Sequence, residues 1–228
     1  NELTSEAMQR VEWLPHGVDC RRFNPAHRSA TLREEWGVES GEQVALCVGR
    51  VAAEKNLIVA LKAVRQMRRE GRQIRPVIVG DGPLRETLSE EFSEAVFTGV
   101  KTGQALSECF ASADLFLMPS QTETFGLVTL EAMASGLPVV AYDMAAAREF
   151  VRTGVDGSLA SDETDEAFTD ALRVALRFDS TLMGLDARSQ AEQLSWDMVA
   201  RQFERRVEAL LASHCESSGV VHPLQTTS

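Results

Sequence analysis

The 228-residue sequence has little of what marks secreted, metal-binding or membrane-spanning proteins. Its four cysteines, at positions 20, 47, 109 and 215, are widely spaced and form no CxxC pair, which argues against a disulfide framework or a cysteine metal site. No apolar run approaches the ~20 residues that span a bilayer, and the first residues lack the apolar centre of a signal peptide. We therefore expect a cytoplasmic protein with no metal or other cofactor, and a peripheral position at the inner membrane face, through a lipid acceptor, stays open.

The sequence also has fewer basic than acidic residues, with 23 Lys and Arg against 34 Asp and Glu. The formal net charge is -11 and the pI is near 4.9, so the average field repels nucleic acid, and we expect no nucleic-acid partner. Any phosphate group must therefore be bound by a local cluster of basic side chains. An apolar content of 44% suffices for one sizeable core.

From residue 44 onward, short apolar runs alternate with longer segments of helical period, which is typical of βαβ units. This pattern predicts an α/β fold with a Rossmann-like, doubly wound parallel sheet. The expected strands are residues 44–48, 76–79, 95–98, 115–118, 138–141 and 157–160. The expected helices between them are residues 54–70, 83–92, 103–112, 126–135 and 145–152.

The two ends of the chain do not belong to this alternation. Residues 1–25 contain a strand-like run at 11–14, followed by a turn at 15–19. Residues 164–212 are nearly all helical in pattern, and Ser195 is a good N-cap for a final helix at 195–212. Residues 213–228 are rich in Ser, Thr, Gly and Pro, which predicts a disordered tail.

Three segments follow expected strands, where open α/β sheets bind ligands. After the first strand, Gly49 allows a sharp turn, and Arg50 and Lys55 can converge on one anion. After the second strand, Gly80, Asp81, Gly82 and Pro83 form a tight turn that can keep a ligand crevice open. Taken singly, the first segment is better explained as surface charges at a helix start, and the second as an ordinary turn. The chain contains no GxGxxG dinucleotide motif.

The third segment follows the fourth expected strand and has two carboxylates. Glu123 precedes a helix that begins at Gly126, and Glu131 lies in the second turn of that helix. The free N–H groups at such a helix start bind anions, and carboxylates accept hydrogen bonds from sugar hydroxyls. The alternative is a surface loop residue and an ordinary solvated helix residue.

These motifs together resemble the group 1 (family 4) retaining glycosyltransferases. The resemblance rests first on Glu123 and Glu131, which are separated by seven residues that include Phe125 and Gly126. It also rests on four motifs earlier in the sequence, namely Gly-Arg…Glu-Lys, Val-Gly-Asp-Gly-Pro, Phe-Thr-Gly and Ala-Ser-Ala-Asp. It covers about residues 11–212 and implies the C-terminal, donor-binding half of a GT-B fold. Ala145, Ala146 and Ala147 depart from the Gly-Gly of many members, so this loop is expected to be stiffer. The same stretch is similar to GDP-mannose-dependent mannosyltransferases.

The resemblance implies a role for each matching residue. Arg50, Lys55 and Glu123 are the expected catalytic residues, with Arg50 and Lys55 on the donor diphosphate and Glu123 on the sugar. Glu131 is expected at the ribose. The other expected donor-binding residues are Gly49, Val100 near the nucleobase, Phe125, Gly126 and Leu127. The family needs no bound metal, and the partner is a nucleoside diphosphate sugar, either a GDP- or a UDP-sugar.

The resemblance also implies a division of the chain. Residues 1–25 would be the hinge and the end of a missing N-terminal domain, residues 26–194 the nucleotide-sugar-binding domain, and residues 195–212 a helix that crosses back. His16, in the hinge, is expected to be structural. The function implied is a hexosyltransferase that retains configuration, with an isolated chain that is inactive. Two alternatives remain open: a sensor that binds a nucleotide sugar, and a protein similar to sugar-nucleotide epimerases.

Overall fold

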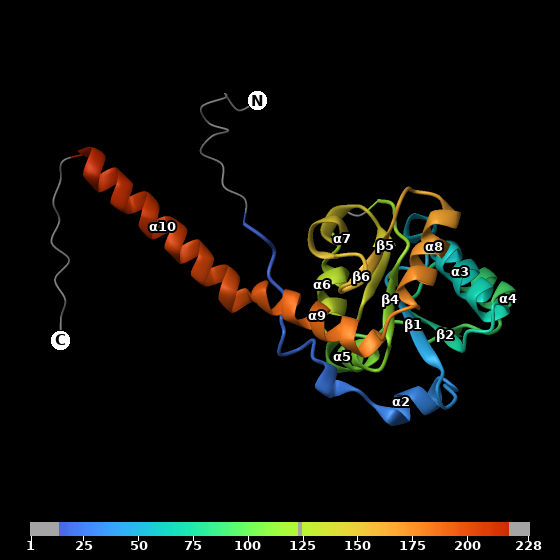
Figure 1. The fold of residues 1–228 in the computed structure, drawn as a ribbon. Coiled ribbons are helices and arrows are strands. Elements are labelled where there is room, and N and C mark those ends of the chain that lie inside the picture. Colours follow the sequence, from blue (N-terminus) through green and yellow to red (C-terminus); the bar gives the residue numbers. More distant parts are fainter. Residues whose placement is uncertain (1–13, 123–124, 219–228) are drawn as a thin grey trace. The chain divides into compact units, whose positions relative to one another are not determined.

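The computed structural model describes residues 14–122 and 125–218 and divides the chain into two compact units (Figure 1). One unit comprises residues 18–193 and contains the whole sheet, whereas the other comprises residues 1–17 and 194–228. Each unit is described separately below.

The larger unit is built on a six-stranded sheet in the order β3-β2-β1-β4-β5-β6, in which every neighbouring pair is parallel. This strand order is that of the doubly wound Rossmann arrangement. The strands are added toward one side of the sheet up to β3 and toward the other side from β4 onward, so the order reverses between β1 and β4. The predicted α/β fold is thus confirmed. The strands are β1 Gln43–Val48, β2 Ile74–Val79, β3 Val96–Phe97, β4 Leu115–Met118, β5 Val139–Tyr142 and β6 Gly157–Ala160.

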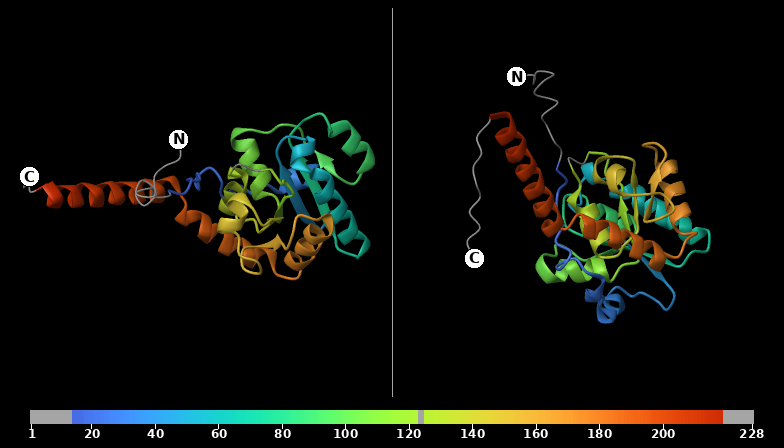
Figure 2. Two further views of the ribbon diagram at one scale, coloured as in Figure 1. Left: turned by 90° about the horizontal axis from the view of Figure 1, so that it is seen from above. Right: turned by 60° about the vertical axis from the view of Figure 1, so that its left-hand side comes forward.

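Helices cover both faces of this sheet (Figure 1, Figure 2). One face is covered by α3 and α8, which pack on each other, and the other by α6 and α9, which also pack together. The helices of this unit are η1 Pro25–His27, α2 Ala30–Glu35, η2 Ala53–Lys55, α3 Leu57–Arg69, α4 Arg85–Glu91, α5 Gly103–Ala111, α6 Leu127–Ala134, α7 Ala145–Phe150, α8 Asp165–Ala175 and α9 Ser180–Gln193.

The strands are apolar on both sides because both sides are buried. In β4, Leu115 and Leu117 belong to the core under α3 and α8, while the Phe116 ring lies 5.7 Å from the ring of Phe110 in α5. Phe110 in turn meets Phe23 edge-on at 5.5 Å. The core on each face therefore fixes the register of the sheet, since a shift by one residue would exchange the two sets of side chains.

The structure differs from the sequence-based expectation at two helices. The helix expected at 54–70 is split, because Asn56 has left-handed backbone angles (φ 49, ψ 33) between η2 and α3. The short helix α2 was not expected. It has no buried residue and begins at Ser29, whose hydroxyl accepts a hydrogen bond from the Leu32 N–H.

The smaller unit contains helix α10, Trp196–Ser218. This helix extends past residue 212, where the expected tail begins, because the sequence has no Gly or Pro before position 219 to stop it. Gly17 lies against Trp196, since a Cβ on Gly17 would be 2.4 Å from the indole ring. The His16 ring meets the same indole edge-on at 4.9 Å. Most of the strand expected at 11–14, and residues 219–228 of the expected tail, lie outside the described residues.

Candidate functional site

The site predicted from the sequence maps to the edge of the sheet where the strands end, which we call the carboxyl-terminal edge. The loops after β1 and β4 leave this edge on either side of the point where the strand order reverses. Open α/β sheets bind their ligands at this point, because the two loops diverge there and leave a crevice.

The loop after β1 carries two basic side chains at this edge of the sheet. Gly49 has φ 151, and the Lys55 side chain folds back over it, with Cε 3.7 Å from the position that a Cβ of Gly49 would occupy. The Arg50 side chain is 67% exposed and forms an ion pair with Glu54 at 3.3 Å. An exposed i,i+4 pair of this kind is weak, so Arg50 can exchange Glu54 for an anionic ligand.

The glycines after β2 hold this loop by direct backbone contact. A Cβ on Gly80 would lie 1.8 Å from the Gly49 carbonyl oxygen, and one on Gly82 would lie 2.4 Å from that of Val51. The Gly49 N–H donates to Val79 O at 3.0 Å, and the Val51 N–H donates to Asp81 O at 2.9 Å. The Gly80 to Pro83 segment is therefore more than a turn beside the crevice, because it supports the loop that carries Arg50 and Lys55.

The loop after β4 is attached to the loop after β1. The Ser120 hydroxyl donates to the Glu54 carbonyl at 3.2 Å, and the Thr122 hydroxyl donates to the same carbonyl at 3.4 Å. Two segments separated by more than 60 positions are thus brought together next to Lys55. The expected sugar contact Glu123 lies outside the described residues, so its side chain is not placed.

The start of α6 confirms the helix expected after this loop. Gly126 has left-handed backbone angles (φ 82, ψ 50), and the described residues give the helix no side-chain cap. No side chain among the described residues therefore accepts a hydrogen bond from the first turn, and N–H groups at a helix start are able to bind an anion. Phe125 is half-buried and accepts a hydrogen bond on its carbonyl from the Ala146 N–H at 2.8 Å, whereas the Leu127 side chain is 42% exposed.

Glu131 is half-buried on α6. Burial is the largest influence on this carboxyl and raises its pKa above the usual value, and the positive charge of Arg22 acts in the opposite direction. A carboxylate in such a place is a strong acceptor, because little water competes for it. Arg22 had no role in the sequence analysis, since nothing in its local sequence relates it to a residue more than 100 positions away.

The expected nucleobase segment lies at the end of β3. Val100 is 68% exposed, and its neighbour Gly99 accepts a hydrogen bond from the Gly80 N–H at 2.9 Å. Arg85 forms an ion pair with Asp81 at 3.1 Å and has Nη1 3.8 Å from the position of a Cβ on Gly99. The exposed Val100 side chain offers an apolar surface beside the loops that carry the basic side chains.

The alanine segment that departs from the family pattern begins in a strained conformation. Ala145 has φ 47, a left-handed value that costs an alanine about 1 kcal/mol. The start of α7 packs on the start of α6 around a cavity of only about 10 Å³, lined by Met118, Gly126 and Ala145 among others. That volume holds at most one water, so these two helix starts form a packed wall.

The described residues contain no group of three or more His, Cys, Asp or Glu side chains that could hold a metal ion. No described helix is both long and apolar enough to cross a membrane.

Comparison with known proteins gives consistent matches. A family model described as "Glycosyl transferases group 1" matches residues 42–177. The chain is 38% identical to sulfoquinovosyl transferase SQD2 of Arabidopsis thaliana over 79% of this chain and 36% of that protein. It is 35% identical to a GDP-mannose-dependent alpha-mannosyltransferase of Mycobacterium tuberculosis (strain CDC 1551 / Oshkosh) over 91% of this chain and 53% of that protein.

Solved structures match in the same way. Sucrose-phosphate synthase from Thermosynechococcus elongatus matches with a TM-score of 0.72 at 25% identity, over 89% of this chain and 53% of that chain. Anabaena Alr3699/HepE in complex with UDP and glucose matches with a TM-score of 0.71 at 21% identity, over 86% of this chain and 56% of that chain. The chain thus spans about half, or less, of the length of these proteins.

Proposed function

Because this chain belongs to the group 1 glycosyltransferases, we propose that it is the donor-binding half of a hexosyltransferase. The donor is a nucleoside diphosphate sugar, the configuration at the transferred sugar is retained, and the acceptor is held by an N-terminal domain. In this proposal residues 26–194 hold the donor, residues 1–25 are the hinge and residues 195–212 cross back to the other domain.

One observation carries this proposal. The loop with Arg50 and Lys55 and the loop that leads into α6 are joined through the Glu54 carbonyl, at the point where the strand order reverses. Basic side chains and a helix start without a described side-chain cap therefore lie on two loops that are joined to each other, and both favour a diphosphate.

The chemistry assigned to the site is electrostatic. When the bond between sugar and diphosphate breaks, negative charge builds up on the leaving diphosphate, and Arg50 and Lys55 are the proposed groups that neutralise it. The backbone at Gly49, Phe125, Gly126 and Leu127 approaches the phosphates and sugar, Glu131 accepts from the ribose hydroxyls, and Val100 contacts the base. Glu123 is proposed as the contact to the sugar. We do not assign it the role of nucleophile, because in front-face displacement the acceptor hydroxyl itself attacks the sugar, while the donor phosphate helps to take the acceptor proton.

The donor base is proposed to be guanine or uracil. Several relatives are named as GDP-mannose-dependent mannosyltransferases, and solved neighbours contain UDP. Calorimetric titration of the 228-residue chain with UDP, GDP and ADP decides between them, because the preferred diphosphate binds more tightly than the other two.

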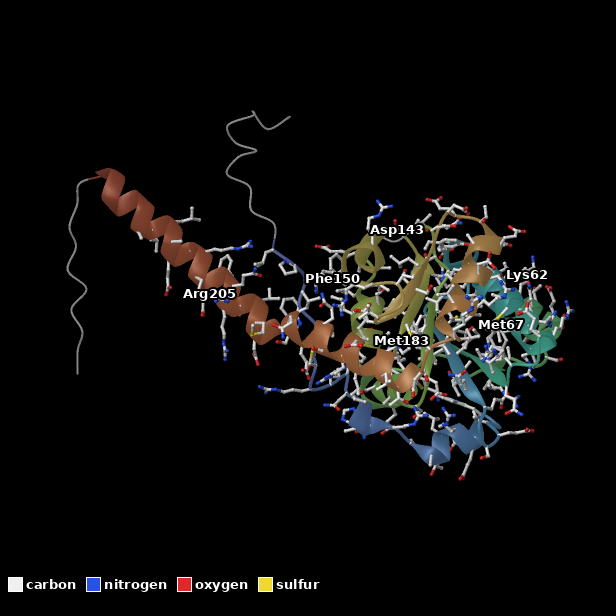
Figure 3. The ribbon with its side chains drawn as sticks, in the orientation of Figure 1. Lys62, Met67, Asp143, Phe150, Met183 and Arg205 are labelled. Atoms are coloured by element: carbon white, nitrogen blue, oxygen red, sulfur yellow. The ribbon has the colours of Figure 1, made fainter. Side chains whose placement is uncertain are left out.

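We expect Lys55→Ala and Arg50→Ala each to weaken binding of the preferred nucleoside diphosphate about 10- to 100-fold, the value of a hydrogen bond to a charged group. Binding of the corresponding nucleoside should change little. Lys62→Ala and Arg69→Ala are the matched controls, since both side chains are exposed on α3, away from the loop (Figure 3 for Lys62). Equal losses for diphosphate and nucleoside would contradict the phosphate role.

The isolated chain is expected to bind the donor but to transfer no sugar. The assay is release of nucleoside diphosphate from a labelled donor in the presence of acceptors, including lipid acceptors. Turnover by this chain alone would show that the acceptor site lies within it.

A further inference from the structure

We propose that a second pocket, at the edge of the sheet where the strands begin, binds a neutral carbohydrate of about one hexose ring. This amino-terminal edge lies opposite the edge assigned to the nucleotide sugar. The inference does not rest on the proposed function, because it uses none of the same residues.

The pocket has a volume of about 330 Å³. Small-ligand sites begin at about 300 Å³, so the pocket accommodates a single ring and not a nucleotide. Its walls come from segments that directly precede β4 and β5, including Ala113 and Leu137, and from η1 and the first turns of α9. All of these segments belong to the unit formed by residues 18–193.

A buried hydroxyl identifies the pocket as a binding site. Ser135 lines it and is only 2% exposed, yet its Oγ is the one buried side-chain oxygen that lacks a hydrogen-bond partner within the described part of the chain. A buried polar group without a partner costs about 1–3 kcal/mol, so such groups in native proteins call for an explanation. A hydroxyl of a bound ligand would provide the hydrogen bond.

The charges around the pocket favour a neutral ligand. Arg188 donates to Cys20 O at 3.0 Å, to Phe23 O at 2.7 Å and to the carbonyl of Ala134, and it pairs with Glu192 at 2.8 Å. These bonds occupy its guanidinium, so Arg188 serves as a wall.

The second arginine at the pocket is occupied in the same way. Arg28 donates to Ala111 O at 3.2 Å and to Ala113 O at 2.7 Å, and it pairs with Asp114 at 2.7 Å. With both positive charges balanced by carboxylates, the groups that remain for a ligand are hydroxyls and apolar surface. A sugar ring offers the same two kinds of group, with hydroxyls at its rim and C–H groups on its faces.

The packing of α9 on the turn after α6 determines the shape of the pocket. Gly184 touches Gly136 through the backbone, since a Cβ on Gly184 would lie 2.2 Å from the Gly136 carbonyl oxygen. This contact puts Thr181 and Leu185, which are one turn apart on α9, at the rim. Leu185 is 63% exposed there and offers an apolar surface to a ring face.

The test is an NMR titration of the full 228-residue chain with methyl α-D-glucopyranoside and methyl α-D-mannopyranoside, followed at the amides of Thr181 and Gly184. We expect saturable shifts with a dissociation constant on the order of 1 mM, as befits a ligand of this size. Ser135→Ala and Thr181→Val should each weaken binding about 5- to 10-fold, the value of one hydrogen bond. Thr169→Val, on α8 and outside the pocket, is the matched control and should bind as the unmodified chain does.

Ser135→Ala removes a hydroxyl that has no hydrogen-bond partner among the described residues, so it should leave the melting temperature unchanged or higher. A loss of sugar binding in this variant would therefore not be caused by unfolding. Sugar binding that is unaffected by Ser135→Ala and Thr181→Val would overturn the proposal. Saturation of the same amides by inorganic phosphate, or no response to either glycoside, would overturn it as well. UDP or GDP should shift amides in the loop after β1 and leave those of Thr181 and Gly184 in place, so failure of this site and failure of the nucleotide site are read separately.

Discussion

Gly80→Ala is expected to destabilise the sheet unit far more than Gly71→Ala, although both glycines have positive φ. The values are 145 for Gly80 and 89 for Gly71. A Cβ on Gly80 would lie 1.8 Å from the Gly49 carbonyl oxygen, whereas a Cβ on Gly71 meets no atom within 4 Å. Gly71→Ala therefore measures the strain of a positive φ alone, and Gly80→Ala measures the strain of its own positive φ together with the clash.

The size of the difference follows from the contacts that must open. Strain at positive φ costs an alanine about 1 kcal/mol. Moving the Gly49 carbonyl away also weakens the bond from the Gly49 N–H to Val79 O and the bond from the Gly80 N–H to Gly99 O, each worth about 1 kcal/mol. We thus expect a loss of about 3 kcal/mol for Gly80→Ala against about 1 kcal/mol for Gly71→Ala.

Urea unfolding followed by circular dichroism measures both losses in the same chain. In a separate thermal unfolding experiment, the melting temperature should fall by about 6–12 °C for Gly80→Ala and about 2–4 °C for Gly71→Ala. Because the displaced loop carries Arg50 and Lys55, Gly80→Ala should also weaken diphosphate binding, while Gly71→Ala should not. Equal urea midpoints for the two variants would refute the idea that backbone contact supports the site.

Two further predictions concern stability. Glu42 is 6% exposed and is paired with Arg68 and Arg75, so Glu42→Gln should cost about 3 kcal/mol at pH 7, measured by urea unfolding. Burial, the largest single influence, raises the pKa of Glu42, but the Glu39 N–H and both arginines lower it below its usual value of 4.5. The difference between Glu42→Gln and the unmodified chain is therefore fully present above pH 4.5 and shrinks as the pH falls through the folded-state pKa; a difference independent of pH would contradict this. Ala145→Gly should stabilise the chain by up to about 0.5 kcal/mol, because relief of about 1 kcal/mol of left-handed strain slightly exceeds the added unfolded-state entropy, and a lower melting temperature would show that φ 47 is not strained.

The strands were predictable because their signal is local. β4 and β6 have the bounds predicted from the sequence, and β4 is a short apolar run between polar segments, whereas β6 has a weaker signal because it contains Gly157 and Ser158. The break at Asn56 was missed because the left-handed conformation of a single residue carries a weak signal, although Asn is the residue that adopts it most readily after Gly. Ala145 had no signal, because alanine rarely adopts left-handed angles, and the hydrogen bond from the adjacent Ala146 N–H to the distant Phe125 carbonyl has no sequence signature.

The candidate site likewise has features that were predictable from the sequence and features that were not. That the segments with Arg50 and Lys55 and with Gly126 would meet at one edge follows from the parallel sheet, whose strands all end there. The attachment of Ser120 and Thr122 to the Glu54 carbonyl could not be predicted, because a backbone acceptor has no sequence signature. The same is true of the influence of Arg22 on Glu131, which depends on how the chain returns to α6 from a distant segment.

The two edges of the sheet use their arginines differently, and this difference argues for the assignment of the nucleotide site. At the edge where the strands begin, the guanidinium groups of Arg28, Arg33 and Arg188 donate hydrogen bonds to backbone carbonyls and pair with carboxylates. At the edge where the strands end, backbone contacts at Gly80 and Gly82 join the loops after β1 and β2, and the hydroxyls of Ser120 and Thr122 join the loops after β1 and β4, so these connections use no arginine. The ion pair of Arg50 with Glu54 there is exposed, so a diphosphate can replace it at little cost. This contrast supports the proposal that the donor binds at the edge where the strands end, because the positive charge of Arg50 is not already used to hold the fold together.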